Sequence, residues 1–265
     1  MGGRELGCFL EGPTFDDGGN LLVVDIPFGR IFQIDPDGRW SQVAEYDGWP
    51  NGMRWSAGRA MIADHKRGLV ELDPATGRYR VIFSSLNGSP LRGLNDLAFA
   101  TDGTLYLTDQ GQSGMHKPNG RVLRLSADGQ LDAVLDNCPS PNGLVCDERR
   151  GWLYVAMTRG NCLWRVPLVK NRPSKVGVAI QLTGGIGPDG IALDGAGNLL
   201  VVQAPFGVWQ MDRNNLPACL WLAPDDAYVT NLALQRRGET TRVFVTDSIR
   251  GSILVADLND AEAPA

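Results

Sequence analysis

A polar residue stands in front of a short apolar strand six times along the chain, once every forty-odd residues. Successive copies are separated by 40, 44, 47, 47 and 42 residues, by subtraction of their positions. A period of this length is typical of one blade of a β-propeller. Because each copy occupies the same point of its repeat, a propeller would gather all of them into a ring around its axis. The copies are Glu11, Asn51, Asn95, Asn142, Asp189 and Asn231.

Each repeat has the same order of short apolar strands and glycine-containing turns, which the third repeat illustrates. Asn95 precedes an apolar strand, Asp102-Gly103 forms a turn, and the returning strand 104–108 leads to Asp109. Asp-Gly between two alternating runs is a strong hairpin signal, and 33 glycines suit a chain with many tight turns. No segment has sustained helical periodicity. The sequence predicts an all-β protein, a six-bladed β-propeller formed by residues 1–265 as one domain.

The two ends of the chain are predicted to meet. The last repeat begins at Asn231 and has room for only about three strands before its end, where blades of this class have four. We expect Arg4–Leu10 to supply the missing outer strand, which would close the ring and remove an open seam. The tail Asp260–Ala265 is rich in Ala and Pro and is predicted to be disordered.

Strand direction predicts a second set of polar side chains at one end of the channel. In an antiparallel blade the second strand runs back toward the leading polar residue, so the Asp that ends this strand should open onto the same face. His65 follows one such Asp and is a candidate substrate contact, because its unperturbed pKa is near neutral; the alternative is a packed histidine. The Gly-rich segment Gln110–Gly120 could cover the channel. The aspartates concerned are Asp25, Asp64, Asp109 and Asp247.

Charge and composition exclude several classes of partner. A formal net charge of -5 with scattered Lys and Arg argues against nucleic acid, and no run approaches the roughly 20 apolar residues of a membrane span. Five cysteines without a C-x-x-C pair indicate reduced thiols. The first residues lack an apolar run, so no signal peptide is expected. We therefore expect a cytoplasmic protein, a monomer or weak homodimer, acting on a small molecule.

Three of the six copies are candidate metal ligands. Glu11 and Asp189 offer carboxylates and Asn142 an amide carbonyl, which together suit a hard divalent cation. Asn-Gly and Asp-Gly are also ordinary turn formers, which is the alternative for Asn142 and Asp189. Glu is not a turn former, and a carboxylate at the inner end of a strand needs a cation or hydrogen-bond donors. Two histidines exclude a three-His zinc site.

These motifs resemble the senescence marker protein, gluconolactonase and luciferin-regenerating enzyme family over nearly the whole chain. The resemblance rests on Glu11-Gly12-Pro13, Pro141-Asn142-Gly143-Leu144 and Pro188-Asp189-Gly190-Ile191, in that order on six repeats. It implies a propeller that holds one divalent metal in its channel through Glu11, Asn142 and Asp189, and that hydrolyses sugar lactones. Asn95 is implied to contact substrate or to complete the surroundings of the metal. Ca²⁺ is the expected metal, with Mg²⁺, Mn²⁺, Fe²⁺ or Zn²⁺ as alternatives.

Two details bear on the chemistry that the resemblance implies. Animal members of the family carry an Arg two residues before the Asn of the third blade, where this chain has Gly93 and places Arg92 one position earlier. Thr108-Asp109 is similar to the site of a proposed general base in bacterial lactonases. The candidate catalytic residues are therefore Asp109 and, in a second role, Asp189.

The sequence thus predicts a metal-dependent hydrolase that opens a lactone ring by polarising the ester carbonyl while a base assists the attacking water. Asn51, Asn95 and Asn231, with His65, are the expected substrate contacts. Two alternatives stay open. The same metal site could serve another reaction, such as phosphotriester hydrolysis, isomerisation or a carbon–carbon bond step. The chain could also be a non-catalytic interaction propeller.

Overall fold

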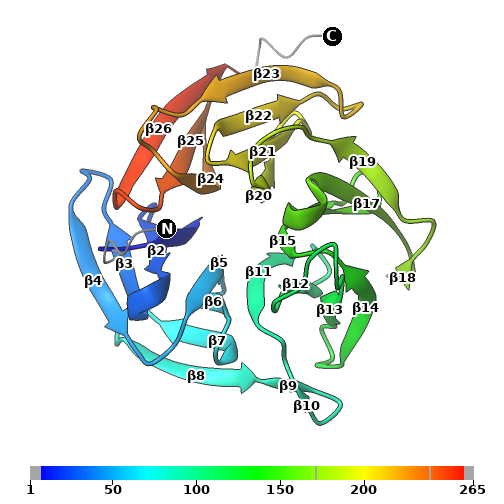
Figure 1. The fold of residues 1–265 in the computed structure, drawn as a ribbon. Helices are drawn as coiled ribbons and strands as arrows, with labels where there is room; N and C mark the ends of the chain where they lie inside the picture. The colour runs from blue at the N-terminus through cyan, green and yellow to red at the C-terminus, as the bar shows by residue number, and fades with distance from the viewer. Residues whose placement is uncertain (1–6, 171, 239, 260–265) are drawn as a thin grey trace.

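The chain forms six β-sheets that radiate from a common axis as the blades of a propeller (Figure 1). The computed structural model describes residues 7–170, 172–238 and 240–259. Neighbouring strands within each blade are antiparallel and follow chain order from the axis outward, except in blade 4, where the last two strands both pair with the third. The prediction of an all-β, six-bladed propeller is confirmed. No helix in these described ranges is long and apolar enough to cross a membrane.

The strands fall into the blades in chain order. Blade 1 contains β1 (Leu10–Phe15), β2 (Leu21–Asp25), β3 (Arg30–Ile34) and β4 (Trp40–Glu45). Blade 2 contains β5 (Pro50–Ser56), β6 (Arg59–Asp64), β7 (Gly68–Asp73) and β8 (Arg78–Phe83), and the hairpin β9 (Ser85–Leu86) and β10 (Ser89–Pro90) follows it. Blade 3 contains β11 (Leu94–Phe99), β12 (Leu105–Asp109), β13 (Gly120–Leu125) and β14 (Leu131–Cys138).

The second half of the ring repeats this order. Blade 4 contains β15 (Pro141–Asp147), β16 (Trp152–Met157), β17 (Cys162–Val169), β18 (Arg172–Pro173) and β19 (Gly177–Gln181). Blade 5 contains β20 (Gly187–Leu193), β21 (Leu199–Ala204), β22 (Gly207–Met211) and β23 (Pro217–Leu222). Blade 6 contains β24 (Val229–Arg237), β25 (Thr240–Asp247) and β26 (Ser252–Asn259). Two 3₁₀ turns, η1 (Ile26–Phe28) and η2 (Thr158–Gly160), follow second strands.

The apolar core lies between adjacent blades, not on the axis. Between blades 1 and 2, for example, Leu22 and Ile31 belong to the same buried cluster as Met53 and Ile62. The second strands are buried on both faces, which explains why they are continuous apolar runs in the sequence instead of alternating ones. With the apolar side chains packed between blades, the axis is left to the polar residues that begin each first strand.

A β-bulge at the start of every first strand fixes which residue faces the axis. The residue just before the expected polar position pairs with the end of the second strand, as in Leu94 with Asp109, and the register then shifts. In blade 6 the corresponding pair is Val229 with Asp247, so the sixth member of the ring is Thr230. The predicted sixth member, Asn231, is one residue further along β24, the same position as Asp96 in β11. The repeat spacing alone cannot detect this shift, because the turns vary in length.

The predicted closure of the ring by a fourth strand on blade 6 is not found in the described chain. The sheet of blade 6 has three strands, and Leu10 begins β1. The N–H of Leu10 donates to the carbonyl of Ser248 (3.2 Å), and the Cys8 thiol lies 3.3 Å from the same oxygen. Because the Leu10 side chain is buried in the core between blades 1 and 6, it holds this segment at the inner end of the blade. Residues 4–6 and the tail 260–265 lie outside the described residues.

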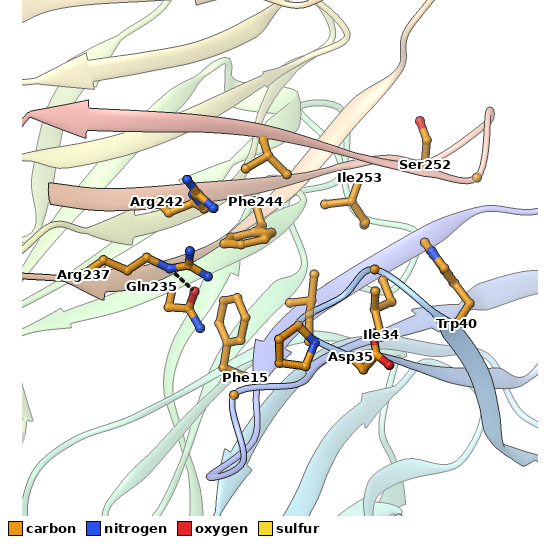
Figure 2. A pocket seen from close by; sticks show the side chains of 16 residues that line it. Phe15, Ile34, Asp35, Trp40, Gln235, Arg237, Arg242, Phe244, Ser252 and Ile253 are labelled. Carbon is orange, nitrogen blue, oxygen red and sulfur yellow. Dashed lines mark hydrogen bonds between the residues drawn. The ribbon is translucent and has the colours of Figure 1, made fainter.

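An open groove remains on the outer side of blade 6, where it faces blade 1 (Figure 2). The groove has a volume of about 460 Å³. Phe15 and Phe244 meet edge to face across it, with ring centroids 5.0 Å apart. None of the six polar residues on the axis lines this groove, so it is not the site that the repeat predicts.

Candidate functional site

A cavity at one end of the channel gathers most of the predicted site residues. It has a volume of about 380 Å³, and we call it the mouth cavity. Five of the six predicted ring residues line it, all except Asn231. Its walls are formed by Phe9, Glu11, Ile26, Asn51, Asn95, Gln110, Gly111, Gln112, Ser113, Ser140, Asn142, Thr158, Arg159, Ile186, Asp189 and Tyr228.

Glu11 is held in the cavity wall by two donors. Its Oε2 accepts hydrogen bonds from the backbone N–H of Gly12 and from Nδ2 of Asn231, both at 2.9 Å. Asn231 is buried beneath the cavity and its side-chain oxygen accepts from the N–H of Leu232 (2.8 Å). Asn231 therefore orients a carboxylate of the site from below, a role different from the substrate contact that the sequence predicted.

Asn142 and Asp189 are tied to each other through Thr158. The amide Nδ2 of Asn142 donates to Thr158 Oγ1 (3.2 Å), and this hydroxyl donates to the carbonyl of Pro188 (2.8 Å), the residue before Asp189. Because the amide nitrogen is used in this way, the side-chain oxygen of Asn142 faces away from Thr158. Strands β15 and β20 thus present an amide oxygen and a carboxylate side by side.

Asn95 supplies a further oxygen. Its Nδ2 donates to Gln110 Oε1 (3.3 Å), while its Oδ1 is buried and has no hydrogen-bond partner among the described residues. A buried carbonyl oxygen without a donor is costly unless a ligand satisfies it. This orphaned oxygen lies in the wall of the same cavity as Glu11 and Asp189.

The two carboxylates of the cavity are costly to ionise without a cation. Burial raises the pKa of Asp189 well above its ordinary range, and the neighbouring charge of Glu11 raises it further. Burial also raises the pKa of Glu11, although the hydrogen bonds from Gly12 and Asn231 oppose this shift. A divalent cation between them would remove both penalties.

A third carboxylate, Asp96, lies below the ring residues. It directly follows Asn95 in β11, which is the position that Asn231 occupies in β24. It is buried, burial raises its pKa, and its Oδ2 stands 3.6 Å from the guanidinium of Arg54. In the other four blades the residue at this position is a glycine. A methyl group on Gly52 would lie 2.2 Å from Asp96 Oδ1, and one on Gly190 would lie 2.2 Å from Asn231 Oδ1. The glycines therefore leave the space that these two side chains occupy.

The residues present fit a hard divalent metal. Oxygen atoms of Glu11, Asp189, Asn142 and Asn95 converge on one cavity, one of them is an orphaned buried acceptor, and two carry charges that burial opposes. Only two of the four are carboxylates, which agrees with the absence of any cluster of three or more His, Cys, Asp or Glu arranged for metal binding in the described ranges.

The raised pKa values predict how the metal-free protein responds to pH. A carboxyl group whose pKa is higher in the folded than in the unfolded state binds more protons when folded, so its effect on stability becomes unfavourable as pH rises. With metal removed by a chelator, we expect the free energy of unfolding to fall as pH rises above about 4.5, the ordinary pKa of Glu. Urea unfolding at several pH values measures this slope. In the Glu11→Gln variant the slope should be smaller, and an unchanged slope would contradict the assignment.

Asp109 lies outside the mouth cavity and both of its oxygens are occupied. Oδ1 accepts from the backbone N–H groups of Arg92 and Gly93, both at 2.8 Å, and Oδ2 pairs with the guanidinium of Arg121. Its side chain is fully buried. The aspartates at the same point of other blades also accept from backbone N–H groups: Asp25 from Phe9, Asp64 from Lys66 and Arg67, and Asp247 from Tyr228.

By accepting these hydrogen bonds, the repeated Asp holds the backbone of the loops at the mouth in place, and we call this arrangement the clamp. In blades 1, 3 and 6 the clamped N–H belongs to the segment that enters the first strand. Gln203 has a similar role in blade 5, where its Nε2 donates to the carbonyls of Thr183 (2.9 Å) and Gly184 (3.0 Å). The geometry favours a structural role for Asp109 and leaves Asp189 as the carboxylate within reach of a ligand.

His65 is half-buried beside the mouth cavity but does not line it. Its ring packs against Gly93, where a methyl group would lie 2.3 Å from Cε1, and its centroid is 5.9 Å from that of Trp49. Burial lowers the pKa of this imidazole. His65 is therefore better described as a histidine packed in the protein than as a residue that contacts substrate.

The segment after β12 contributes to the site as expected, with Gln110, Gly111, Gln112 and Ser113 in the cavity wall. The sequence reasoning missed other wall residues, notably Arg159, Ser140 and Tyr228. They belong to turns at the strand ends, and residues of these turns do not recur at a fixed position in each repeat. The one available signal is that Arg159 lies two residues after the end of β16, the strand that pairs with β15.

The comparisons with known proteins agree with the fold. Residues 9–246 match the model of the SMP-30/Gluconolactonase/LRE-like region, and the chain belongs to this family. The gluconolactonase of Zymomonas mobilis is 27% identical over 234 residues, which cover 75% of this chain and 65% of that protein. Diisopropyl-fluorophosphatase of Loligo vulgaris is 28% identical over 224 residues, covering 73% of this chain and 71% of that protein. Among solved structures, the calcium-binding protein regucalcin of Agrobacterium tumefaciens superposes with a TM-score of 0.77 at 24% identity, over 90% of this chain and 82% of that one.

The matched region thus spans slightly less than two thirds of the gluconolactonase relative's length, and the structural match shows the shared propeller fold.

Proposed function

We propose that this protein is a metal-dependent lactonase that opens a sugar lactone. The observation that carries the proposal is the pair of carboxylates Glu11 and Asp189, which face one cavity together with the amide oxygens of Asn142 and Asn95. The name of the Zymomonas mobilis relative, gluconolactonase, supports a lactone substrate, and the calcium-binding protein regucalcin supports a divalent metal.

Glu11, Asn142 and Asp189 would hold the metal, with Asn95 beside them, and Ca²⁺ is the ion that this set of oxygen ligands favours first. When bound, the metal supplies a Lewis acid that polarises the ester carbonyl. Asn51 and the free oxygen of Asn95 bind and orient substrate hydroxyl groups at the cavity wall. Asn231 keeps Glu11 in place from below through its 2.9 Å hydrogen bond.

Water attacks the carbonyl carbon of the lactone while a carboxylate oxygen of Asp189 takes its proton. The bond between the carbonyl carbon and the ring oxygen then breaks, and this oxygen leaves as a hydroxyl group after receiving from Asp189 the proton that the water gave up. The product is an open-chain hydroxy acid, which leaves as its carboxylate. Asp109 takes no part in this scheme, because Arg121 and two backbone N–H groups use both of its oxygens.

A substrate panel tests the proposal. Aldonolactones, aromatic lactones and simple γ-lactones would be assayed by titration of the released acid, after reconstitution of the protein with Ca²⁺, Mg²⁺, Mn²⁺, Fe²⁺ or Zn²⁺ in turn. We expect aldonolactones to be hydrolysed with at least one metal. Failure of every lactone with every metal would reject the lactonase assignment.

A phosphotriesterase is the second candidate, favoured by the 28% identity with diisopropyl-fluorophosphatase. The same metal and carboxylates could act on a phosphoryl oxygen in place of a carbonyl oxygen. Fluoride release from diisopropyl fluorophosphate, measured beside the lactone panel, separates the two candidates. The cytoplasmic location and the monomeric or weakly dimeric state stay predictions from the sequence.

A further inference from the structure

Arg159 places a positive charge in the wall of the mouth cavity. It belongs to η2, directly after Thr158, the residue that orients Asn142. Among the described residues that line the cavity it is the one cationic side chain, and its charge opposes the rise in the pKa of Asp189 that burial causes. Arg159 is exposed at the cavity entrance, so its guanidinium is available to a ligand.

The charges around Arg159 balance without it once a metal is bound. Glu11 and Asp189 together offset a divalent cation, and Asp96 beneath them is paired with Arg54 at 3.6 Å. The guanidinium of Arg159, which acts on Asp189 in the metal-free protein, is then left without an uncompensated carboxylate among the described residues of the cavity. A surplus cation at the entrance of a small-molecule site favours a ligand that brings its own negative charge.

The polar and apolar walls of the cavity lie on different blades. Gln110, Gln112 and Ser113 follow β12 of blade 3, and Ser140 precedes β15 of blade 4, which carries Arg159. The apolar wall comes from the neighbouring blades 1, 5 and 6, through Phe9, Ile26, Ile186 and Tyr228. A ligand seated over the metal ligands is thereby oriented, with its most polar end toward Arg159.

The stem of Arg159 lies near the loop that supplies this polar wall. A methyl group on Gly114 would lie 3.9 Å from Arg159 Cγ, the distance of an ordinary van der Waals contact.

We infer that Arg159 determines specificity by binding a free carboxylate on the substrate, so that the preferred substrate is a lactone that carries a second, unesterified acid group. The planar guanidinium matches a carboxylate with two parallel hydrogen bonds. This inference rests on the proposed lactonase function for its substrate class, while the anion site itself rests on Arg159 and the cavity.

Two lactones that differ in one group test the inference by kinetics. D-glucaro-1,4-lactone carries a carboxylate where D-glucono-1,4-lactone carries a hydroxymethyl group, and the rings are the same. We expect the native protein to prefer the glucarolactone in kcat/KM by about 10- to 100-fold, the range of a hydrogen-bonded charge pair. Arg159→Met should remove this preference and leave hydrolysis of the gluconolactone within about twofold of the native rate. Arg159→Lys should keep part of the preference for the glucarolactone.

Arg149→Met is the matched control, because Arg149 is an exposed arginine of the same blade in the turn between β15 and β16, at the opposite end from the mouth. This variant should keep the native preference. A native protein without preference for the glucarolactone, or an Arg159→Met variant that slows both lactones equally, would overturn the inference.

Binding of the open-chain acids separates this inference from the proposed function. Calorimetric titration of the calcium-loaded protein with D-glucarate and with D-gluconate requires no turnover. We expect D-glucarate to bind more tightly to the native protein, and Arg159→Met to bind the two acids equally. That result together with no hydrolysis of any lactone would reject the lactonase assignment and keep the anion site. Equal binding by the native protein would overturn the anion site, whatever the activity.

Discussion

Asp189→Asn is expected to abolish metal binding and to lower kcat/KM for a lactone by on the order of 10³-fold or more, while the propeller stays folded. The substitution keeps the shape of the side chain and removes the negative charge that a divalent cation needs. Burial and the charge of Glu11 already oppose ionisation of this group, so its loss should not destabilise the metal-free protein. Metal content by atomic emission, steady-state kinetics and urea unfolding measure the three effects.

Asp212→Asn is the control for this variant. Asp212 belongs to the same blade but lies in the turn between β22 and β23, where it accepts from the N–H groups of Asn214 and Leu216 at 2.8 Å. An amide oxygen can accept the same bonds, so this variant should keep native metal content and activity. An Asp189→Asn protein that retains its metal and its activity would refute the assignment of Asp189.

Arg121→Met is expected to have the largest effect on stability, a loss of about 3–5 kcal/mol in the free energy of unfolding. Asp109 is fully buried, and this substitution would leave its carboxylate without a countercharge. Arg80→Met is the matched control, because Arg80 pairs with Glu71 at 2.7 Å on the surface, where such pairs contribute about 0–1 kcal/mol. Urea unfolding of the two variants compares them directly.

Asp109→Asn tests whether Asp109 has this structural role or acts as the general base. If Asp109 is structural, the variant should be less stable, and the folded fraction should keep kcat within a fewfold of the native value. A variant of native stability with a kcat lowered 100-fold or more would contradict the clamp and make Asp109 the general base that the sequence suggested.

The repeat predicted the architecture well because the spacing of one blade recurs along the whole chain, so the signal does not depend on any single residue. Six polar residues in phase with six apolar strands are enough to predict a propeller and the residues around its axis. Five of those residues do line one cavity. The sixth was wrong by one position, because Thr230 and Asn231 are both polar and only the pairing of Val229 with Asp247 decides which of them is equivalent to the other five.

The roles of individual side chains were harder to predict than their positions. Strand direction correctly places Asp109 at the mouth end of β12, but it cannot tell whether a carboxylate points into the channel or toward a neighbouring strand. The partner that turns Asp109 away is Arg121, directly opposite it in β13. Arg159 and Tyr228 lie in turns without repeat phase, so their place in the cavity wall depends on the folding of loops.

We propose that Glu11, Asn142 and Asp189 bind a divalent metal on which lactone opening depends. The most direct measurement is the initial rate of D-glucono-1,4-lactone hydrolysis by chelator-treated protein as Ca²⁺ and then each alternative metal is titrated back. We predict no activity above the uncatalysed rate before metal is added, and saturation at one ion per chain afterwards. Full activity in protein shown by atomic emission to contain no metal would contradict a metal-dependent reaction at these residues.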